Sequence, residues 1–220
     1  MVALKGIIPA QNGQDIYLLF QHLESDVFKA VKNRVLDQMH KKYIVYQLAC
    51  GLKYLHSAGV LHRDLKPSNV LINAQCQVKI CDFGLSRTLE SAFFNQPIMT
   101  EFIATRWYRA PEVLLGSRSY GTKSDMWSLG CLIYELYSRR TLLPGENTID
   151  QISKIVEFKG KPTANEIKTF KTEKGDEILS YFNVERRDRR FYYDDLEIEE
   201  IKPILDQLLQ YDPDKRWSAE

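Results

Sequence analysis

The chain contains a short run of residues whose types suit phosphate chemistry, His62-Arg63-Asp64-Leu65-Lys66-Pro67-Ser68-Asn69. A carboxylate such as that of Asp64 can accept or orient the proton of an attacking hydroxyl group. Lys66 carries a charge that can balance a transferring phosphate. Magnesium prefers oxygen ligands, and the side chains of Asn69 and Asp82 supply two of them. Residues of these types are compatible with phosphoryl transfer, a reaction that depends on positioning and charge neutralisation.

The same eight residues resemble the catalytic loop H-R-D-L-x-x-x-N of eukaryotic Ser/Thr protein kinases. Two further motifs of that family follow in order, Asp82-Phe83-Gly84 and Ala110-Pro111-Glu112. One triplet alone would be a weak signal, but three motifs at the family's spacing are specific. The resemblance extends over the whole chain, and it implies an enzyme that uses ATP and Mg²⁺ to phosphorylate protein Ser and Thr.

The resemblance also assigns roles to single residues. The implied catalytic residues are Asp64, Lys66 and Thr105, and the implied metal ligands are Asn69 and Asp82. Phe20 corresponds to the gatekeeper, Gln21 to Leu23 correspond to the hinge whose backbone binds adenine, and Leu71 corresponds to the floor under that ring. Phe20 and Leu71 equally suit ordinary core packing.

Other family positions have structural roles. His62 and Phe83 resemble members of the hydrophobic spine that joins the two lobes of a kinase. Asp125, in D-M-W-S-L-G, resembles the aspartate that binds the backbone of the catalytic loop. Glu112 and Arg216 resemble a buried ion pair that anchors the activation segment.

The segment from Thr100 to Glu112, T-E-F-I-A-T-R-W-Y-R-A-P-E, identifies the closest kinase group. It resembles the activation lip of the mitogen-activated protein kinases, which reads T-x-Y before A-T-R-W-Y-R-A-P-E. Cyclin-dependent kinases share W-Y-R-A-P-E and diverge before it. The segment 7–26 also resembles the mitogen-activated kinases. A phenylalanine gatekeeper, here Phe20, is more similar to that of their atypical members than to that of the well-known ones.

One departure from this pattern changes the expected regulation. Phe102 stands where the family has tyrosine, so the lip has no second hydroxyl to phosphorylate. We therefore expect Thr100 to be the single activating site, modified by an upstream kinase or by autophosphorylation. Its phosphate would meet Arg63 and Arg87, because a phosphothreonine forms charge-assisted hydrogen bonds with such cations.

Two more arginines follow the lip. The resemblance implies that Arg106 and Arg109 would bind a phosphotyrosine of the lip, but Phe102 removes that partner. Arg109 can still shape the site for the residue after the phosphoacceptor. The family prefers proline there, and proline has no N–H to leave unsatisfied. We expect protein substrates with Ser-Pro and Thr-Pro sites.

A docking groove for linear peptides is a further implication of the resemblance. Leu36, His40 and Tyr43 match residues of that groove in the mitogen-activated kinases. Ordinary packing of a long helix explains these three residues equally well.

The apolar patterns predict a mainly helical α+β chain with a few strands near its beginning. A helical stripe runs over 37–58, an apolar helix over 122–137 and an amphipathic helix over 197–211. Residues 16–20 predict a buried strand, 70–72 and 78–80 a small hairpin, and 162–195 read as irregular. We expect residues 1–25 to end a small lobe and form the hinge, and 26–220 to form an incomplete C-terminal lobe.

Val2-Ala3-Leu4-Lys5 resembles the V-A-I-K strand of kinases but lies only sixteen residues before Gln21, which leaves no room for the helix that follows such a strand. Lys5 is therefore expected on the surface. Without that lysine and a Gly-rich loop, this stretch alone is expected to be inactive. Three readings follow: part of an active kinase, a catalytically incompetent binding or scaffold module, or an enzyme completed by another polypeptide.

Composition is that of a globular chain of 220 residues, with 44% hydrophobic and 27% charged residues. The net charge of +1 provides no global field to attract nucleic acid or a membrane. The four cysteines form no C-x-x-C pair, which favours free thiols in a reducing compartment. No apolar run of transmembrane length occurs, and we expect the cytoplasm, the nucleus or both.

Overall fold

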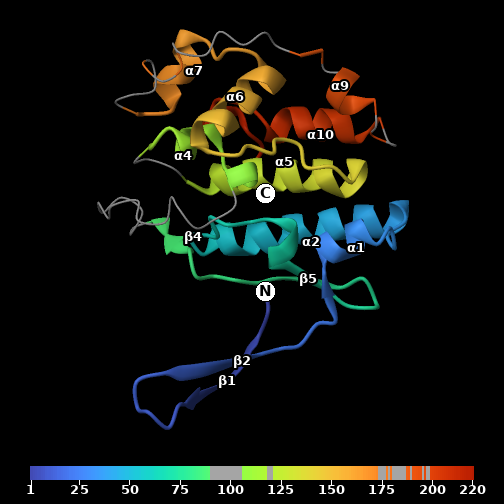
Figure 1. Cartoon of the computed structure of the whole chain (residues 1–220), viewed down its shortest axis with the longest axis vertical. Coiled ribbons are helices and arrows are strands. Elements are labelled where there is room, and N and C mark those ends of the chain that lie inside the picture. Colours follow the sequence, from blue (N-terminus) through green and yellow to red (C-terminus); the bar gives the residue numbers. More distant parts are fainter. Residues whose placement is uncertain are drawn as a thin grey trace.

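The computed structural model describes residues 1–89, 106–117, 121–172, 177, 179, 187–188, 190–194, 196 and 199–220. This part of the chain forms a helical body, from which a two-stranded hairpin projects at the N-terminal end (Figure 1). The predicted α+β class is confirmed. Helices predominate, and all strands of the described residues lie within the first 88 positions.

The projecting hairpin pairs β1 (Leu4–Pro9) with β2 (Ile16–Phe20) in antiparallel fashion. The strand at 16–20 was predicted correctly, but its predicted burial is wrong, since all five of its residues are exposed. No described element covers the hairpin, so its apolar side chains stay in solvent. Lys5 is exposed, as predicted. The N–H of Val2 donates to the carbonyl of Ile80 at 2.9 Å and ties the base of the hairpin to the body.

Two helices follow the hairpin. Asp26 caps α1 (Val27–Lys32), and Asp37 caps α2 (Gln38–Ser57), each by accepting a backbone N–H of the first turn. The α2 bounds agree with the predicted helix over 37–58. Its buried stripe contains Ile44, Leu48 and Leu52, which follow one another at four-residue steps.

Short strands surround the segment that carries the predicted chemistry. The hairpin of β5 (Val70–Ile72) and β6 (Val78–Ile80) has the predicted bounds, and β3 (Ser25–Asp26) pairs with β5 on its other side. A second small sheet pairs β4 (Val60–Leu61) with β7 (Arg87–Thr88). A 3-10 turn, η1 (Pro67–Asn69), leads directly into β5. These strands hold residues 61–87 on one side of α2.

The buried helix predicted over 122–137 is α5 (Thr122–Ser138), and every residue from Asp125 to Tyr137 is buried. It lies between α2 and α10 (Ile201–Leu208) and packs against both (Figure 1). A Cβ atom at Gly130 would come within 2.8 Å of Leu209 Cδ2, so only glycine permits this close approach of the chain at the end of α10.

The last helix is shorter than the predicted 197–211. It begins at Ile201, because Pro203 lacks an N–H and is tolerated only in the first turn of a helix. Residues 162–195 also contain more structure than predicted. Thr163 and Glu166 form a capping box that starts α7 (Ala164–Thr169), which the T-x-x-E spacing could have indicated. Residues 197–198 lie outside the described part.

The remaining elements complete the body. They are η2 (Arg106–Tyr108), α4 (Pro111–Leu114), α6 (Thr148–Lys159), α9 (Arg190–Tyr193) and η3 (Pro213–Lys215). All four cysteines are free thiols, as predicted. Within the described ranges, no helix has the length and hydropathy needed to cross a bilayer.

Candidate active site

The backbone before the candidate catalytic residues is held by one buried carboxylate from α5. Asp125, 1% exposed, accepts the N–H of His62 and the N–H of Arg63, each at 2.9 Å. Arg63 has φ = 69°, in the left-handed region that non-glycine residues avoid. In this conformation both N–H groups point at the Asp125 side chain, so Asp125 stabilises a strained turn next to Asp64. The predicted contact of Asp125 is confirmed.

His56 also binds this carboxylate, which the sequence did not reveal. Its Nε2 donates to Asp125 Oδ2 at 3.0 Å from the last turn of α2. His56 lies on the face of α2 that packs against α5. The pattern of polar and apolar residues along α2 does not indicate which polar side chain will bind a residue of another helix. α2 and α5 are thus joined by a polar contact as well as by their apolar faces.

Two of the predicted residues, Lys66 and Asn69, donate to the same oxygen atom of a third, Asp64. Lys66 Nζ donates to Asp64 Oδ2 at 2.8 Å, and Asn69 Nδ2 donates to the same oxygen at 3.0 Å. Asn69 also donates to the backbone carbonyl of Asp64 at 2.8 Å. The Asp64 side chain is 9% exposed, so two donors fix its orientation in a site with little water. Its second oxygen, Oδ1, accepts no hydrogen bond among the described contacts.

His62 links this loop to the strand that ends at Asp82. The N–H of Asp64 donates to His62 Nδ1 at 3.3 Å, so the ring proton lies on Nε2, which donates to the carbonyl of Cys81 at 2.9 Å. The His62 ring is fully buried and meets Phe83 edge-to-face at 5.1 Å, which agrees with the expected membership of both residues in one hydrophobic spine. The N–H of Cys81 donates to the carbonyl of Asn69 at 2.9 Å. Cys81, the residue directly before Asp82, is therefore bonded to both His62 and Asn69.

The side chains of Asn69 and Asp82 fit a magnesium ion. Both N–H bonds of the Asn69 amide are used on Asp64 oxygens, which leaves the amide oxygen as a ligand. Asp82 is exposed, has φ = 62° and accepts only the weak 3.4 Å bond from Gly84 among its described contacts. The described residues contain no cluster of three His, Cys, Asp or Glu side chains suited to a metal. Two oxygen ligands instead suit magnesium, which keeps water and phosphate oxygens as its other ligands.

The predicted nucleotide residues lie where the hairpin joins the body. The N–H of Gln21 donates to the carbonyl of Ala3 at 2.8 Å, Leu23 is buried, and Leu71 is half-buried. The β3–β5 register sets Leu71 opposite Asp26, three residues after Leu23. Phe20 is 50% exposed, so the core-packing explanation is wrong for this residue.

A buried ion pair anchors the segment after the activation lip, as predicted. Glu112 receives Arg216 NH1 on one carboxylate oxygen and NH2 on the other, both at 2.7 Å. The side chains are 2% and 0% exposed. Ser124 Oγ also donates to Glu112 at 3.0 Å, and the guanidinium stacks over Trp127 at 5.1 Å. The pair ties residues 106–117 to α5 and to the C-terminal turn.

The predicted regulatory arginines fall into two pairs. The β4–β7 register sets Arg87 opposite Leu61, two residues before Arg63, and Arg63 NH1 donates to the carbonyl of Leu85 at 3.1 Å. Arg106 and Arg109 are half-buried on and beside η2, and the N–H of Arg109 donates to the carbonyl of Arg106 at 3.0 Å. Arg63 and Arg87 therefore precede the lip along the chain, and Arg106 and Arg109 follow it.

Thr100, Phe102 and Thr105 lie outside the described residues. The segment that follows them is held by a second carboxylate, which the sequence analysis missed. Glu135 on α5 accepts the Tyr108 hydroxyl at 2.7 Å, and burial raises the pKa of both groups. Glu135 lies within the apolar run from Leu129 to Tyr137, and an acidic residue inside such a run was the available signal.

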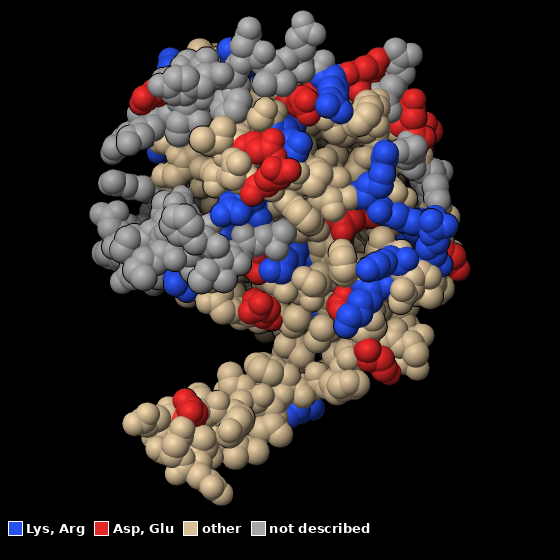
Figure 2. Space-filling model, in the orientation of Figure 1, with Lys and Arg blue, Asp and Glu red and all other residues tan. Residues whose placement is uncertain are grey.

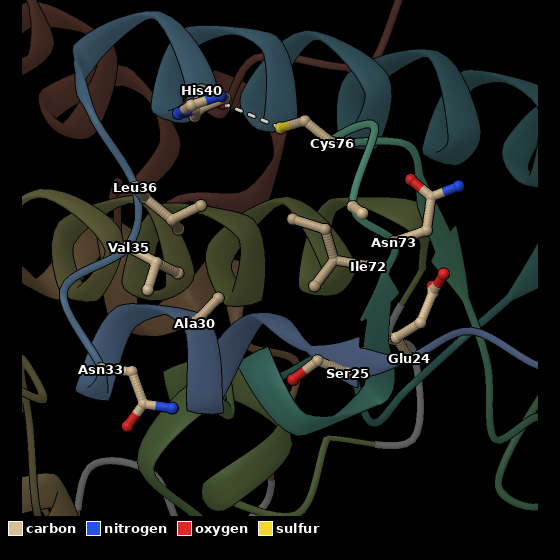
Figure 3. A pocket seen from close by; sticks show the side chains of 11 residues that line it. Glu24, Ser25, Ala30, Asn33, Val35, Leu36, His40, Ile72, Asn73 and Cys76 are labelled. Atoms are coloured by element: carbon tan, nitrogen blue, oxygen red, sulfur yellow. Dashed lines mark hydrogen bonds between the residues drawn. The ribbon is translucent and has the colours of Figure 1, made fainter.

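Two of the three predicted docking residues line one pocket. The pocket has a volume of about 340 Å³ and lies between α1, the beginning of α2 and the turn of the β5–β6 hairpin. Leu36 and His40 belong to its wall (Figure 3). Tyr43 does not line it, but is 45% exposed one turn further along α2. The second explanation for these residues, packing inside the long helix, does not fit the exposure of Tyr43.

Comparison with known proteins indicates the same class of protein as the sequence motifs. A family model described as "Protein kinase domain" matches residues 1–220, so the chain belongs to the protein kinase family. Extracellular signal-regulated kinase 2 of Dictyostelium discoideum is 43% identical over 224 residues, which cover 100% of this chain and 60% of that protein. Mitogen-activated protein kinase 15 of Xenopus laevis is 40% identical over 232 residues, which cover 100% of this chain and 38% of that protein.

A third relative is mitogen-activated protein kinase spk1 of Schizosaccharomyces pombe, 37% identical over 224 residues that cover 100% of this chain and 60% of that protein. Together these relatives place the chain among the mitogen-activated protein kinases. The chain spans 60% or less of the length of each of the three.

Proposed function

We propose that this chain forms the catalytic-loop and substrate-facing part of an ATP-dependent protein Ser/Thr kinase of the mitogen-activated type. The observation that carries the proposal is the convergence of Lys66 and Asn69 on one oxygen of Asp64. We assign residues 1–25 to the end of the small lobe and the hinge, and residues 26–220 to the C-terminal lobe. The family likeness supports a protein of the cytoplasm or nucleus.

The geometry suggests how each residue contributes. Asp64 Oδ1 would accept the proton of a substrate hydroxyl, because Oδ2 is already bound by Lys66 and Asn69. Lys66 Nζ, 2.8 Å from that carboxylate, would face the negative charge of the transferring group. Magnesium-bound ATP supplies the phosphoryl group and neutralises its charge. The Asn69 amide oxygen and the Asp82 carboxylate would hold the metal.

The adenine ring would lie at the junction of the hairpin and the body. The carbonyl of Gln21 and the N–H of Leu23 would bind its edge, since the N–H of Gln21 is used by Ala3. Leu71 would lie under the ring. We propose that residues 1–220 alone hold ATP poorly, because this stretch contains neither a Gly-rich loop nor a lysine–glutamate pair for the phosphates.

The test is phosphate transfer to a Ser-Pro peptide by the enzyme that contains this lobe together with a small lobe. We expect Asp64→Asn to lower the rate by about 10²- to 10⁴-fold, the usual contribution of a positioned general base. Glu146→Gln, a change of an exposed carboxylate, is the matched control and should leave the rate unchanged. A folded Asp64→Asn variant with full activity would contradict the proposal. A wild-type enzyme without transfer would favour the binding or scaffold alternative.

We propose Thr100 as the single activating phosphorylation site, phosphorylated by an upstream kinase or by the enzyme itself. Support comes from Phe102, which removes the second acceptor, and from Arg63 and Arg87, which lie at one end of the β4–β7 sheet. Thr100→Ala should abolish activation, whereas Thr88→Ala, an exposed threonine of β7, should not. Unchanged activity of Thr100→Ala would show that this assignment is wrong.

Substrate choice is proposed to favour proline after the phosphoacceptor. Arg109 directly follows η2, and the Trp107 ring N–H donates to the carbonyl of Gly145 at 2.9 Å, so the surrounding backbone is held in place. Thr105, the third implied catalytic residue, would contact the substrate from the same segment. A peptide array should show enrichment of Ser-Pro and Thr-Pro, and equal signals without proline would contradict this choice.

Docking of partner proteins is proposed for the pocket lined by Leu36 and His40. Met39 and Tyr43 extend its apolar surface, since they lie four residues apart on one face of α2 and are 72% and 45% exposed. An extended peptide could therefore fill the pocket and continue along the helix.

A further inference from the structure

A second cavity lies on the far side of α5 from the candidate active site. It is bounded by the C-terminal half of α5, the loop that follows it, α6 and the beginning of α9. In Figure 1, α6 and α9 lie above α5, whereas β5, which directly follows the catalytic loop, lies below it. The cavity has a volume of about 250 Å³. This is slightly less than the volume of pockets for drug-sized ligands, about 300–1,000 Å³, and suits a small molecule or a single side chain.

Part of the cavity wall is aromatic and apolar. The ring of Tyr192 packs edge-to-face against Phe158 at 4.9 Å and against Phe191 at 5.1 Å, and these contacts fix its orientation. Leu142 and Leu143, both buried, also belong to the lining or back of this region. Such a wall suits the face of an aromatic ring.

The Tyr192 hydroxyl has no hydrogen-bond partner among the residues that the structure describes. The residue is only 6% exposed, and a tyrosine buried to this extent usually has a partner for its hydroxyl. Burial and the nearby Glu157 carboxylate raise the pKa of Tyr192 to about 12, so the hydroxyl keeps its proton at neutral pH. Tyr192 therefore offers a hydrogen-bond donor to a ligand in the cavity.

Cations outnumber carboxylates in the described part of the cavity wall. Arg140, Lys154 and Arg187 belong to it, together with one acidic residue, Glu157. The ammonium group of Lys154 lies 3.8 Å from Asp150, which is beyond hydrogen-bond distance, so its donors remain available to a ligand. The wall therefore attracts a negatively charged group.

Arg187 is held in place by α6 and by α9. Its backbone N–H donates to the carbonyl of Glu157 at 2.9 Å, and its NH2 lies 3.2 Å from the Glu157 carboxylate. The guanidinium group also lies over the Phe191 ring, 4.8 Å from its centre. A guanidinium has five N–H donors, so one contact through NH2 leaves others for an anion. Their planar fork matches the oxygen atoms of a phosphate group.

The surface around this cavity has charges of both signs. On the face that Figure 2 shows, Lys and Arg side chains lie next to Asp and Glu side chains in the upper part of the body, where α6 and α9 lie in Figure 1. A nucleic acid or an anionic membrane would require a broad basic surface. The excess of positive charge belongs to the cavity wall, which favours a small anionic group as the ligand.

We propose that this cavity binds an aryl phosphate, that is, a phosphate ester of a small aromatic group. The aromatic ring packs against the wall that contains Tyr192. The phosphate oxygens accept charge-assisted hydrogen bonds from Lys154 and Arg187 and a hydrogen bond from the Tyr192 hydroxyl.

The experiment is isothermal titration calorimetry of the full-length protein with phenyl phosphate, phenol and inorganic phosphate. Phenyl phosphate should bind at least about tenfold more tightly than either of the others, because only this compound uses both the aromatic and the cationic parts of the wall. Lys154→Gln/Arg187→Gln should weaken its binding by about tenfold or more, and Tyr192→Phe, which keeps the ring, by about threefold to tenfold. Lys42→Gln/Lys53→Gln, which changes two exposed lysines of α2, is the matched control and should bind like the wild type.

Three results would overturn the proposal. They are no binding of phenyl phosphate to the folded wild-type protein, equally tight binding of inorganic phosphate, and binding that neither Lys154→Gln/Arg187→Gln nor Tyr192→Phe weakens. The Tm of each variant shows whether it is folded. If the double variant does not fold, Lys154→Gln alone replaces it, because this change leaves the contact between Arg187 and Glu157 intact.

A phosphotyrosine pentapeptide distinguishes two sources of the aryl phosphate. Tighter binding of the peptide than of phenyl phosphate would support the site and assign it to a phosphorylated side chain of a protein. Weaker binding of the peptide would support the site and assign it to a free small molecule, because a cavity of about 250 Å³ has little room for a peptide backbone.

Discussion

Removal of Arg216 should be among the most destabilising single changes in this chain. Its guanidinium donates to both oxygens of Glu112 and to the backbone carbonyls of Gln210, Lys123 and Tyr211. Arg216→Met would leave the Glu112 carboxylate 2% exposed with Ser124 Oγ as its described donor. Breaking a buried pair from one side costs about 3–5 kcal/mol. A domain is stable by only about 5–15 kcal/mol, so the variant would be close to unfolding.

The cause can be separated from the loss of packing by a double-mutant cycle. Glu112→Gln alone leaves the buried charge of Arg216 with a neutral partner, whereas Glu112→Gln/Arg216→Met leaves no buried charge. We expect the double variant to be less destabilised than the sum of the two single variants by about 1–3 kcal/mol. The measurement is the free energy of unfolding from urea titrations followed by tryptophan fluorescence.

A neighbouring lysine provides the control for this cycle. Lys215 is 71% exposed and 3.9 Å from Asp212, so Lys215→Met should change the free energy of unfolding by less than about 0.5 kcal/mol. Additivity of Glu112→Gln and Arg216→Met would refute the reasoning, because it would mean that neither charge depends on the other. The anchoring of residues 106–117 would then rest on their apolar contacts.

Three further predictions concern α5. Asp125→Ala should lower the free energy of unfolding by about 1–3 kcal/mol for each donor that loses its acceptor, namely the N–H groups of His62 and Arg63 and the ring N–H of His56. Asp125→Asn, measured by the same urea titration, should cost less because one oxygen remains. Burial raises the pKa of Glu135 above its ordinary 4.5, so the folded state holds this proton more tightly and stability should fall as pH rises from 4.5 through the raised pKa. Glu135→Gln should remove that component from the pH profile of unfolding, and an unchanged profile would contradict it. Gly130→Ala should destabilise by about 1–3 kcal/mol, seen as a lower Tm, because the new methyl group meets the end of α10.

Local patterns predicted most of the elements that surround the site. The long helix, the β5–β6 hairpin and α5 follow from apolar spacing and from turn residues between them. The last helix was predicted too long because an apolar stripe continued on both sides, whereas Pro203 decides where the helix begins. Burial of β2 was predicted from its composition, but burial depends on which elements cover a strand.

The types of the candidate catalytic residues could be read from the sequence, but their arrangement could not. Asp64, Lys66 and Asn69 lie within six residues of one another, and their chemistry can be read from that spacing. The partners that hold them come from far along the chain: Asp125 from α5 and His56 from the end of α2. Such contacts require two helices to pack, and no local pattern encodes which polar side chain will face which.

The sequence by itself determined the kinase class, because the motifs H-R-D-L-x-x-x-N, D-F-G and A-P-E occur in order. Tertiary structure alone decided which oxygen of Asp64 remains available, since only the fold brings two donors to the other one. It also decided that Leu36 and His40 share a cavity with Ile72, thirty-two residues after His40. Residue types are local properties of the chain, whereas hydrogen-bond geometry and cavities arise when distant segments pack together.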